Sequence, residues 1–468
     1  MHKITADSSE SYGGSFMKII IVGCGKVGAA LAGELNEEGN NITVVDLVAE
    51  RVNDVSSKYD VMGVVGNGAT HATLQEADID RADLLIAVTD SDELNLLCCL
   101  IAKKAGNCQT IARVRSPEYN TEAPYLKDEL GLAMVINPEY AAAAEIARVL
   151  RFPSAMKIDT FAKGRVEMMK FRLPEGSPLV GCAVKELANK FRCDVLICTV
   201  EREDDAFIAN GDLVFEEKDV ISLIATPKNA NDFFRKIDYK LNSVKDVMII
   251  GGGGIAHYLC RILKRSGNIN VKVIEKNPKR CDELCTQLED VSIICGDAAE
   301  QALLLEEGLE SAGGFVALTN LDEENIFLSL FAKRVSKGKL ITKINRIDFD
   351  DVIKHLDLDT IIYPKNITCE TIVRYVRAMK NTIGSNVETL YNIVKGKIEA
   401  AEFHIKDGSP VVGIPLYELK FNASVLIAAI LRGRQVIIPR GNDTIQPGDS
   451  VVIVSNHIEM HDITDILK

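Results

Sequence analysis

The stretch Lys18-Ile-Ile-Ile-Val-Gly-Cys-Gly-Lys-Val-Gly28 is an apolar run that leads directly into a glycine-rich loop with the spacing GxGxxG. Helix-forming residues follow the loop, so the stretch predicts a buried strand, a tight turn and a helix, in that order. A second version, Val247-Met-Ile-Ile-Gly-Gly-Gly-Gly-Ile-Ala256, begins its loop 228 positions later (251 − 23). Ala256 is the small residue that this motif also permits at its third place.

Two further landmarks repeat in the same order. Ala87-Val-Thr-Asp-Ser-Asp-Glu-Leu-Asn95 recurs as Ala317-Leu-Thr-Asn-Leu-Asp-Glu-Glu-Asn325, 230 positions further on (317 − 87). Gly176-Ser-Pro-Leu-Val-Gly181 recurs as Gly408-Ser-Pro-Val-Val-Gly413, 232 positions further on (408 − 176). Three landmarks at nearly one offset indicate a duplicated unit, and its length means that each copy must bury a core of its own.

The glycine loops have the properties of a pyrophosphate cradle. Gly23 would allow the tight turn, Gly25 would let phosphates approach the backbone, and Gly28 would let helix and strand pack closely. The helix that begins there offers unbonded N–H groups and about half a positive charge. The alternative is a glycine-rich turn that binds nothing.

An acidic residue ends the strand that follows each loop. Asp46 lies 18 positions after Gly28 (46 − 28), and Glu275 matches it in the second copy. A carboxylate at this place accepts hydrogen bonds from the ribose hydroxyls of an adenosine and repels a 2′-phosphate, by about 4 kcal/mol for two charges 4 Å apart at an effective dielectric constant of 20. NAD(H), ATP or ADP is therefore favoured over NADP(H). The alternative for Asp46 is a residue that merely forms the turn at the strand end.

Polar residues also follow the other predicted strands. Ligands bind at the carboxyl ends of parallel strands, near the point where the strand order reverses. Thr89-Asp90 and Thr319-Asn320 follow the fourth strand of each copy, Asn67 and Asp297 follow the third, and Arg113 and Lys343 end the fifth. Two alternatives stay open: Thr89 and Asp92 could cap the next helix, and Arg113 could be a surface charge or contact a neighbouring subunit.

Strand and helix patterns alternate through each copy. Continuous apolar runs, which are typical of strands buried on both faces, predict a parallel, doubly wound α/β sheet of the Rossmann type. The strands expected in the first sheet are 18–22, 42–45, 61–65, 84–88, 110–114 and 134–136, and a strand of the last small domain is expected at 424–432. Beyond a linking helix, a β-rich segment predicts a small α+β domain. We therefore expect five regions: an extension at 1–16, nucleotide-binding sheets with linking helices at 17–155 and 244–384, and small domains at 156–243 and 385–468.

Composition narrows the possible partners. The net charge is −13, so nucleic acid and anionic lipid would both be repelled overall. No apolar run approaches the roughly 18 residues that span a bilayer, so a protein partner would have to hold the chain at a membrane. The 12 cysteines lack disulfide-framework spacing and fit a reducing cytosol, and a metal site at Cys281 and Cys285, or at His457 and His461, is disfavoured.

The sequence lacks the usual signatures of catalysis. There is no GxxxxGK[ST] loop, no nucleophile elbow and no HExxH. A dehydrogenase needs a substrate domain that supplies an acid or base beside the nicotinamide, and the small duplicated domains offer no evident candidate. We therefore expect a non-catalytic sensor, with an NAD-dependent oxidoreductase as the alternative.

Taken together, these duplicated motifs from Met17 to the C-terminus resemble the TrkA family, the cytosolic regulatory subunits of Trk-type potassium uptake systems. The resemblance implies two Rossmann-like domains, each followed by a smaller one, in a homotetrameric ring that lies on the inner face of the membrane through a channel subunit of TrkH type. It implies NAD(H), ATP and ADP as ligands, whose binding would gate potassium flow. Regulation of another ion channel or of an antiporter is an alternative that shares every motif.

The resemblance also implies which residues contact the dinucleotide. These are Gly23, Cys24, Gly25, Lys26, Val27, Gly28, Asp46, Asn67, Thr89, Asp90 and Arg113 in the first copy, and Gly251, Gly252, Gly253, Gly254, Ile255, Glu275, Asp297, Thr319 and Asn320 in the second. Three departures affect the ligand preference of the two sites: Asn67 stands where Asp is usual, Ala256 replaces the third glycine, and Lys343 replaces an arginine.

Overall fold

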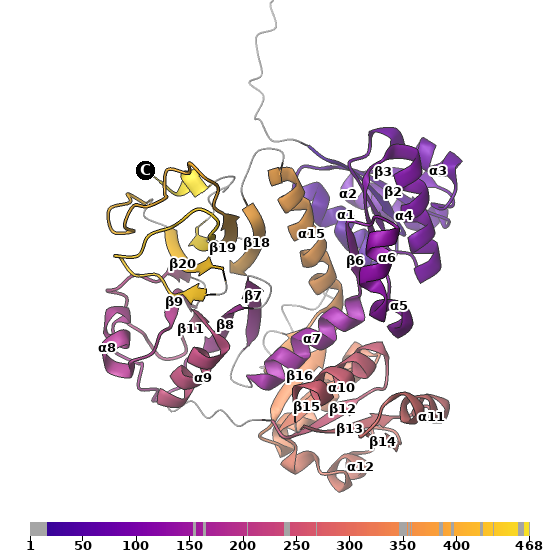
Figure 1. The fold of residues 1–468 in the computed structure, drawn as a ribbon. Coiled ribbons are helices and arrows are strands. Elements are labelled where there is room, and N and C mark those ends of the chain that lie inside the picture. Colours follow the sequence, from indigo (N-terminus) through magenta and orange to yellow (C-terminus); the bar gives the residue numbers. More distant parts are fainter. Residues whose placement is uncertain are drawn as a thin grey trace, which may run out of the picture. The chain divides into compact units, whose positions relative to one another are not determined.

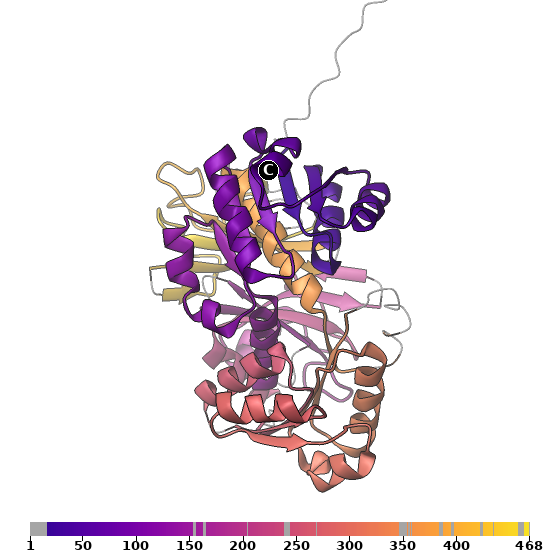
Figure 2. The same ribbon diagram turned by 90° about the vertical axis from the view of Figure 1, so that its right-hand side faces the viewer.

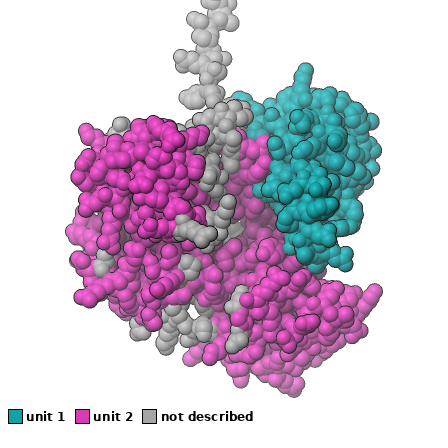
Figure 3. All heavy atoms as spheres, viewed as in Figure 1, with its two compact units in different colours: residues 1–136 teal, residues 137–468 magenta. Residues whose placement is uncertain are grey.

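The computed structural model describes most of the chain as two compact units, Met1–Ile136 and Asn137–Lys468 (Figures 1 and 3). The described residues are 16–152, 156–161, 165–203, 205–237, 244–267, 269–345, 353, 356, 358–382, 387–394, 397–421, 425–433, 435–456 and 463–467. Almost all of the predicted extension, the first residue of the strand expected from Ser424, and both His457 and His461 lie outside them. The predicted domain boundaries remain a prediction.

The first unit is a six-stranded parallel sheet. Its strands are β1 (Lys18–Val22), β2 (Asn41–Asp46), β3 (Met62–Val65), β4 (Leu84–Ala87), β5 (Gln109–Arg113) and β6 (Met134–Ile136), in the order β3-β2-β1-β4-β5-β6. The order reverses between β1 and β4, which places the switch point beside the glycine loop. The predicted doubly wound sheet is confirmed.

Helices connect these strands. They are α1 (Lys26–Glu37), α2 (Ala49–Tyr59), α3 (His71–Glu76), the 3₁₀ turn η1 (Ile79–Arg81), α4 (Asp92–Gly106), α5 (Pro117–Thr121) and α6 (Ala123–Glu129). One face of the sheet is covered by α3 and α4, whose Leu74, Cys99 and Ala102 pack on Leu85 and Ala87. Cys99 is therefore a core residue.

The second unit contains a parallel sheet of identical order. Its strands are β12 (Asp246–Ile250), β13 (Asn270–Glu275), β14 (Ser292–Cys295), β15 (Gly314–Ala317), β16 (Lys339–Lys343) and β17 (Thr360–Ile362), and its helices are α10 (Gly254–Ser266), α11 (Pro278–Gln287), α12 (Gln301–Glu306), η4 (Leu309–Ser311) and α13 (Asp322–Val335). Alternate residues of β12 point to opposite faces: Ile249 packs with α10 and α11, and Met248 packs with α12 and α13. The helices thus cover both faces (Figure 2).

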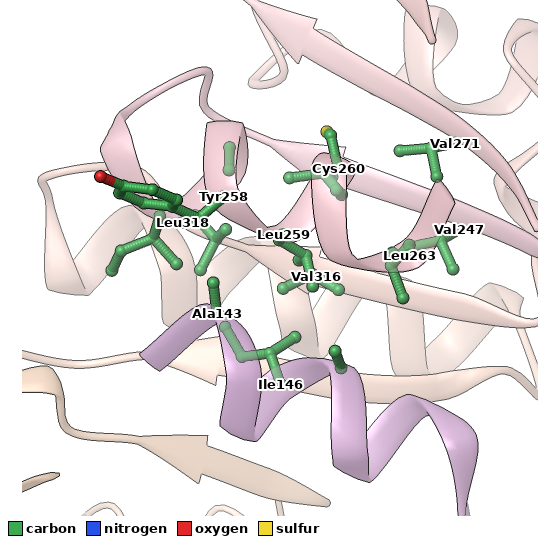
Figure 4. Close-up of a cluster of buried hydrophobic side chains, with 14 of the residues drawn as sticks. Ala143, Ile146, Val247, Tyr258, Leu259, Cys260, Leu263, Val271, Val316 and Leu318 are labelled. Atoms are coloured by element: carbon green, nitrogen blue, oxygen red, sulfur yellow. The ribbon is translucent and has the colours of Figure 1, made fainter. Parts of the chain in front are cut away.

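The helix that follows the first sheet packs against the second. Helix α7 (Pro138–Arg151) buries Ala143 and Ile146 against Leu259 of α10 and Val316 of β15 (Figure 4). At its start, the Asn137 Oδ1 accepts from the Tyr140 N–H at 2.8 Å, and the amide donates to the Tyr258 hydroxyl at 2.9 Å. The second linking helix is α15 (Pro364–Thr382).

Two antiparallel sheets complete the second unit. One has the order β10-β9-β11-β8-β7 and the other β18-β19-β22-β20-β21, so each repeats the topology of its twin. The elements are β7 (Lys157–Phe161), β8 (Val166–Arg172), η3 (Val184–Glu186), α8 (Leu187–Phe191), β9 (Leu196–Arg202), β10 (Asp205–Ile208), β11 (Val220–Ala225), α9 (Pro227–Lys236), β18 (Val387–Val394), β19 (Ile398–His404), β20 (Val425–Arg432), β21 (Gln435–Ile437), β22 (Ser450–Ser455) and η5 (Ile463–Ile466).

The two antiparallel sheets pack face to face. Phe161 and Met168 of the first contact Ala400 and Val452 of the second in one apolar cluster, and the Tyr391 hydroxyl donates to the Thr160 carbonyl at 2.6 Å. Strand β8 is therefore buried on both sides, although its sequence alternates. Within the described residues, no helix combines the length and apolar character needed to cross a bilayer.

Candidate nucleotide sites at the carboxyl edge of each sheet

The first glycine loop is a tight turn that only glycine fits. Gly23 has φ +106°, and its N–H donates to the Val45 carbonyl at 2.7 Å. A Cβ added to Gly28 would lie 1.8 Å from the Gly23 carbonyl oxygen. Helix α1 then begins at Lys26 without a hydrogen bond from a capping side chain, so its first N–H groups face the loop, where an anion would bind.

The second loop repeats this turn. Gly251 has φ +95°, and its N–H donates to the Ile274 carbonyl at 2.9 Å. Helix α10 begins at Gly254 and also has no side-chain cap hydrogen bond. The cradle is therefore present in both copies, with exposed Gly25 and Gly253 at the helix N-caps.

Each strand-end carboxylate ties the glycine loop to the next turn. Asp46 accepts the Cys24 N–H at 2.7 Å and the Val48 N–H at 2.9 Å. Glu275 accepts the Gly252 N–H at 2.7 Å and the Asn277 N–H at 2.8 Å. The turn-forming role is thus real, and it leaves the ribose role open because each carboxylate oxygen has a second lone pair.

The residues after the third strands form short turns on themselves. Asn67 Oδ1 accepts the Ala69 N–H at 3.0 Å, and Asp297 Oδ1 accepts the Ala299 N–H at 2.9 Å. Both side chains are exposed at the same edge of their sheets. The amide and the carboxylate therefore shape the backbone in the same way and differ in charge.

A threonine–asparagine pair fixes the end of the fourth strand in each copy. The Thr89 hydroxyl donates to Asn95 Oδ1 at 2.7 Å, and Thr319 repeats the bond with Asn325 at 2.8 Å. Both asparagines are fully buried and also donate to the end of the fifth strand. The asparagines themselves were not foreseen as site residues, although each closes the duplicated motif that contains the threonine.

The capping alternative for Thr89 and Asp92 is wrong. Ser91 caps α4, because its hydroxyl accepts the Leu94 N–H at 3.1 Å. Asp92 instead accepts the N–H groups of Arg115 and Ser116 at 2.9 and 2.8 Å. Ser91 lies two residues nearer the helix than Thr89, and its hydroxyl therefore reaches the open N–H group, whereas Thr89 belongs to the strand end.

Arg113 is not a surface charge, because its side chain is buried. Its guanidinium donates to the Thr89 carbonyl and lies 3.4 Å from the Asp90 carboxylate. Lys343 occupies the same place in the second copy, also buried, with its ammonium 3.4 Å from the Leu318 carbonyl. Each sheet thus holds a positive charge beneath the loop that follows its fourth strand.

The second copy gathers its predicted residues around one cavity of about 340 Å³. The predicted residues that line it are Gly251, Gly252, Gly253, Glu275, Asp297, Thr319 and Asn320. Gly254 and Ile255, the first two residues of α10, are not in this lining; Gly254 is exposed, and the side chain of Ile255 is buried in the apolar core. The cavity lies at the carboxyl edge of the sheet, which is the general location of ligand sites in doubly wound sheets.

Arg280 also lines this cavity, and sequence reasoning missed it. Its Nε donates to the Gly252 carbonyl at 2.8 Å, and its Nη1 pairs with Glu283 at 2.8 Å. A signal for it was present, since Arg280 and Arg51 both come five positions after the strand-end acid (280 − 275 and 51 − 46). No group of three or more His, Cys, Asp or Glu residues in the described parts of the chain has the arrangement of a metal site.

Fold and site together define a class of proteins in which a nucleotide-type sheet and a small antiparallel domain occur twice in one chain. The TrkA-N domain family matches residues 19–138 and 247–364, and the TrkA-C domain family matches 168–238 and 400–468. The chain belongs to the TrkA family of Trk potassium uptake proteins.

Named relatives agree with this assignment, and solved structures share the fold. The chain is 32% identical to Trk system potassium uptake protein TrkA homolog 1 of Methanosarcina mazei, over 94% of this chain and 97% of the relative. It is 33% identical to the TrkA protein of Vibrio alginolyticus, over 93% and 95%. The GsuK channel shares its fold with a TM-score of 0.64 at 17% identity, over 96% of this chain and 78% of the channel chain, and the GsuK channel bound to NAD does so with a TM-score of 0.63.

Proposed function

We propose that this chain is a non-catalytic sensor that binds adenine nucleotides at both sheet edges and thereby gates a membrane potassium channel subunit of TrkH type. The observation that carries the proposal is the duplicated bond between a strand-end carboxylate and the glycine loop, 2.7 Å long in both copies. An acid held there presents its remaining lone pairs to the two hydroxyls of an unphosphorylated ribose. Relatives named as Trk potassium uptake proteins support the channel partner.

NAD(H), ADP and ATP are the proposed ligands. Their phosphates would lie on the N-termini of α1 and α10, and their ribose on Asp46 or Glu275. The other predicted residues would complete each site: Cys24, Lys26, Val27, Asn67, Thr89, Asp90 and Arg113 in the first copy, and Ile255, Asp297, Thr319 and Asn320 in the second.

Gating would follow from competition between ligands. Two nucleotides that share one cradle but differ in their phosphates and second base would stabilise different arrangements of the chain. A difference of about 1–3 kcal/mol per site gives a usable coupling, and several sites in a homotetrameric ring would reach the roughly 5.5 kcal/mol of a near-complete switch. The ring would lie on the cytoplasmic side of the membrane, held there by the channel subunit.

Titration calorimetry of the full chain with ADP and NADH tests the binding claim. Asp46→Ala should weaken the first site and Glu275→Ala the second, each by about tenfold or more, because a hydrogen bond to a charged group contributes roughly 1.5–3 kcal/mol. Asp46→Asn keeps one acceptor and separates loss of charge from loss of the loop tether. Asp54→Ala and Glu289→Ala remove exposed carboxylates nearby and serve as charge-matched controls.

Unchanged affinities in both site variants would refute the assignment. The gating claim is tested by potassium flux into vesicles that contain the channel subunit, with and without this chain and each nucleotide. Equal flux under all nucleotide conditions would contradict it. Oxidation of NADH in the presence of candidate substrates, seen as a loss of NADH absorbance, would instead support the oxidoreductase alternative.

A further inference from the structure

Three cysteines surround the strand end that carries Glu275. Cys281 and Cys285 lie one turn apart on α11, and Cys295 ends β14, the strand beside β13 (Figure 1). All twelve cysteines of the chain are described, and only Cys285 and Cys295 are exposed. The other ten are buried or half-buried, which makes this cluster the accessible thiol site of the chain.

Backbone geometry brings Cys281 and Cys295 together. The Cys281 thiol donates to the Glu275 carbonyl at 3.3 Å, and the Gly296 N–H donates to the same oxygen at 3.0 Å. Cys295 precedes Gly296 and is the direct register partner of Glu275 across the parallel ladder. Burial raises the pKa of the Cys281 thiol to about 11, and the neighbouring Cys295 side chain makes the next largest contribution to this rise.

Cys281 and Cys285 are not a suitable pair. Residues four apart on a helix hold their Cβ atoms about 5–6 Å apart, whereas a disulfide requires about 3.5–4.5 Å. The side chains of Cys281 and Cys295 come from different elements that meet at Glu275: the Cys281 thiol donates to the Glu275 carbonyl, and Cys295 is the register partner of Glu275. A shift of the β14 end toward α11 would join them. Cys295 is exposed and can react with an oxidant in solvent, whereas Cys281 is buried.

We propose that Cys281 and Cys295 form a reversible disulfide that makes the second nucleotide site sensitive to the thiol–disulfide balance of its surroundings. The oxidant is a low-molecular-weight disulfide. The Cys295 thiolate attacks one of its sulfurs, which forms a mixed disulfide and releases one thiolate. The Cys281 thiolate then attacks the Cys295 sulfur, the protein disulfide forms, and the second thiolate leaves. Two thiol protons pass to the two departing thiolates, and excess thiol reverses both steps.

The disulfide would act on the site through two neighbours. It removes the thiol hydrogen that Cys281 donates to the Glu275 carbonyl, and it draws Cys295 toward α11. Gly296 and Asp297, which line the cavity, follow Cys295 directly. This consequence rests on the proposed function of the site, and we expect the affinity for ADP to fall about fivefold or more, which is the range of a typical coupling.

The first copy has no cysteine at any of these three positions. Val52, Ser56 and Val65 occupy the places of Cys281, Cys285 and Cys295 when Asp46 is aligned with Glu275 and Gly66 with Gly296. Oxidation should therefore leave the first site unchanged, and one chain contains both the sensitive site and its control.

The test uses the full chain equilibrated with defined ratios of reduced to oxidised glutathione, alkylated, digested and analysed by mass spectrometry. The expected result is a crosslinked peptide pair that contains Cys281 and Cys295 and disappears with excess thiol. Cys285→Ser should still form it. Cys281→Ser should instead accumulate glutathione on Cys295, and Cys295→Ser should remove the crosslink.

Stable glutathione on Cys295 of the unaltered chain, or a crosslink between Cys285 and Cys295 in place of the expected pair, would overturn the proposal. Calorimetry with ADP on the oxidised chain then measures the consequence. A crosslink that forms in a chain whose second site never binds ADP would refute the nucleotide function of that site alone. Binding of ADP in a chain that never forms the crosslink would refute the disulfide alone.

Discussion

The two parallel sheets are twins in backbone and differ in side chains. Strand order, the positive φ of the first glycine and the carboxylate-to-loop bond are the same in both copies. Residues around the two candidate sites have diverged: Arg113 against Lys343, Asn67 against Asp297, and Val65 against Cys295. The backbone features that form the glycine loop are the same in both copies, whereas nearby side chains differ. We therefore expect two sites of one kind with different ligand preferences.

The largest expected effect is common to both copies. NADPH should bind about a thousandfold more weakly than NADH at either site, because its 2′-phosphate would meet Asp46 or Glu275 at a cost of about 4 kcal/mol. Competition binding with the two dinucleotides measures this difference in affinity. Asp46→Asn should narrow it at the first site only, and equal affinities in the unaltered chain would contradict the role given to both acids.

The next effect is a difference in stability between the two copies, which comes from the packing at the third position of each glycine motif. Gly28→Ala should destabilise the first sheet by about 3 kcal/mol, because its Cβ would lie 1.8 Å from the Gly23 carbonyl oxygen. Ala256→Gly should cost about 1 kcal/mol, the ordinary helix penalty of glycine. Hydrogen exchange of the β1 and β12 peptides reports each region separately, and β1 protection that survives Gly28→Ala would show that the turn is not as tight as described.

A smaller effect on nucleotide binding is expected from Arg280 of helix α11. Arg280→Ala should weaken ADP binding at the second site about tenfold, or roughly 1.5 kcal/mol, because its hydrogen bond to the Gly252 carbonyl fixes it at the cavity. Arg51→Ala should have a lesser effect at the first site, since Arg51 is exposed. Arg265→Ala, another exposed position in the second copy, is the control, and an equal loss for Arg265 and Arg280 would point to general charge.

The smallest effect tests the divergence at the third strand. Asn67→Asp and Asp297→Asn each keep an oxygen for the turn N–H, so fold stability should change by less than about 0.5 kcal/mol. Asn67→Asp should weaken ATP more than ADP, because it adds a negative charge near the phosphates. Calorimetry with the two nucleotides decides this, and a preference that moves the other way would remove this position from the account of selectivity.

Much of this fold can be predicted from local sequence patterns. The apolar runs predicted β1 and β6 to the residue and the other first-sheet strands to within one residue at either end. The signal is clearest in the central strands β1 and β4, because they are buried along nearly their whole length. The glycine spacing and the acid that follows it likewise predicted the carboxyl edge as the candidate site.

Other features depend on contacts that local sequence does not encode. The face-to-face packing of the antiparallel sheets joins residues more than two hundred positions apart, such as Thr160 and Tyr391. The packing of α7 on α10 also joins distant residues, such as Asn137 and Tyr258, which are 121 positions apart. The spacing that Arg280 shares with Arg51 is a weak signal by itself, because an arginine on a helix is usually a solvated charge. The bond to the Gly252 carbonyl is what places Arg280 at the cavity.

The most direct test is the number of ADP molecules that one full chain binds, measured by titration calorimetry at saturating ligand. We predict two in the unaltered chain, one tight site in Asp46→Ala, one in Glu275→Ala, and none in the double variant. Two tight sites that persist in the double variant, or no binding in the unaltered chain, would contradict the claim that an acid at the strand end holds an adenosine in each sheet.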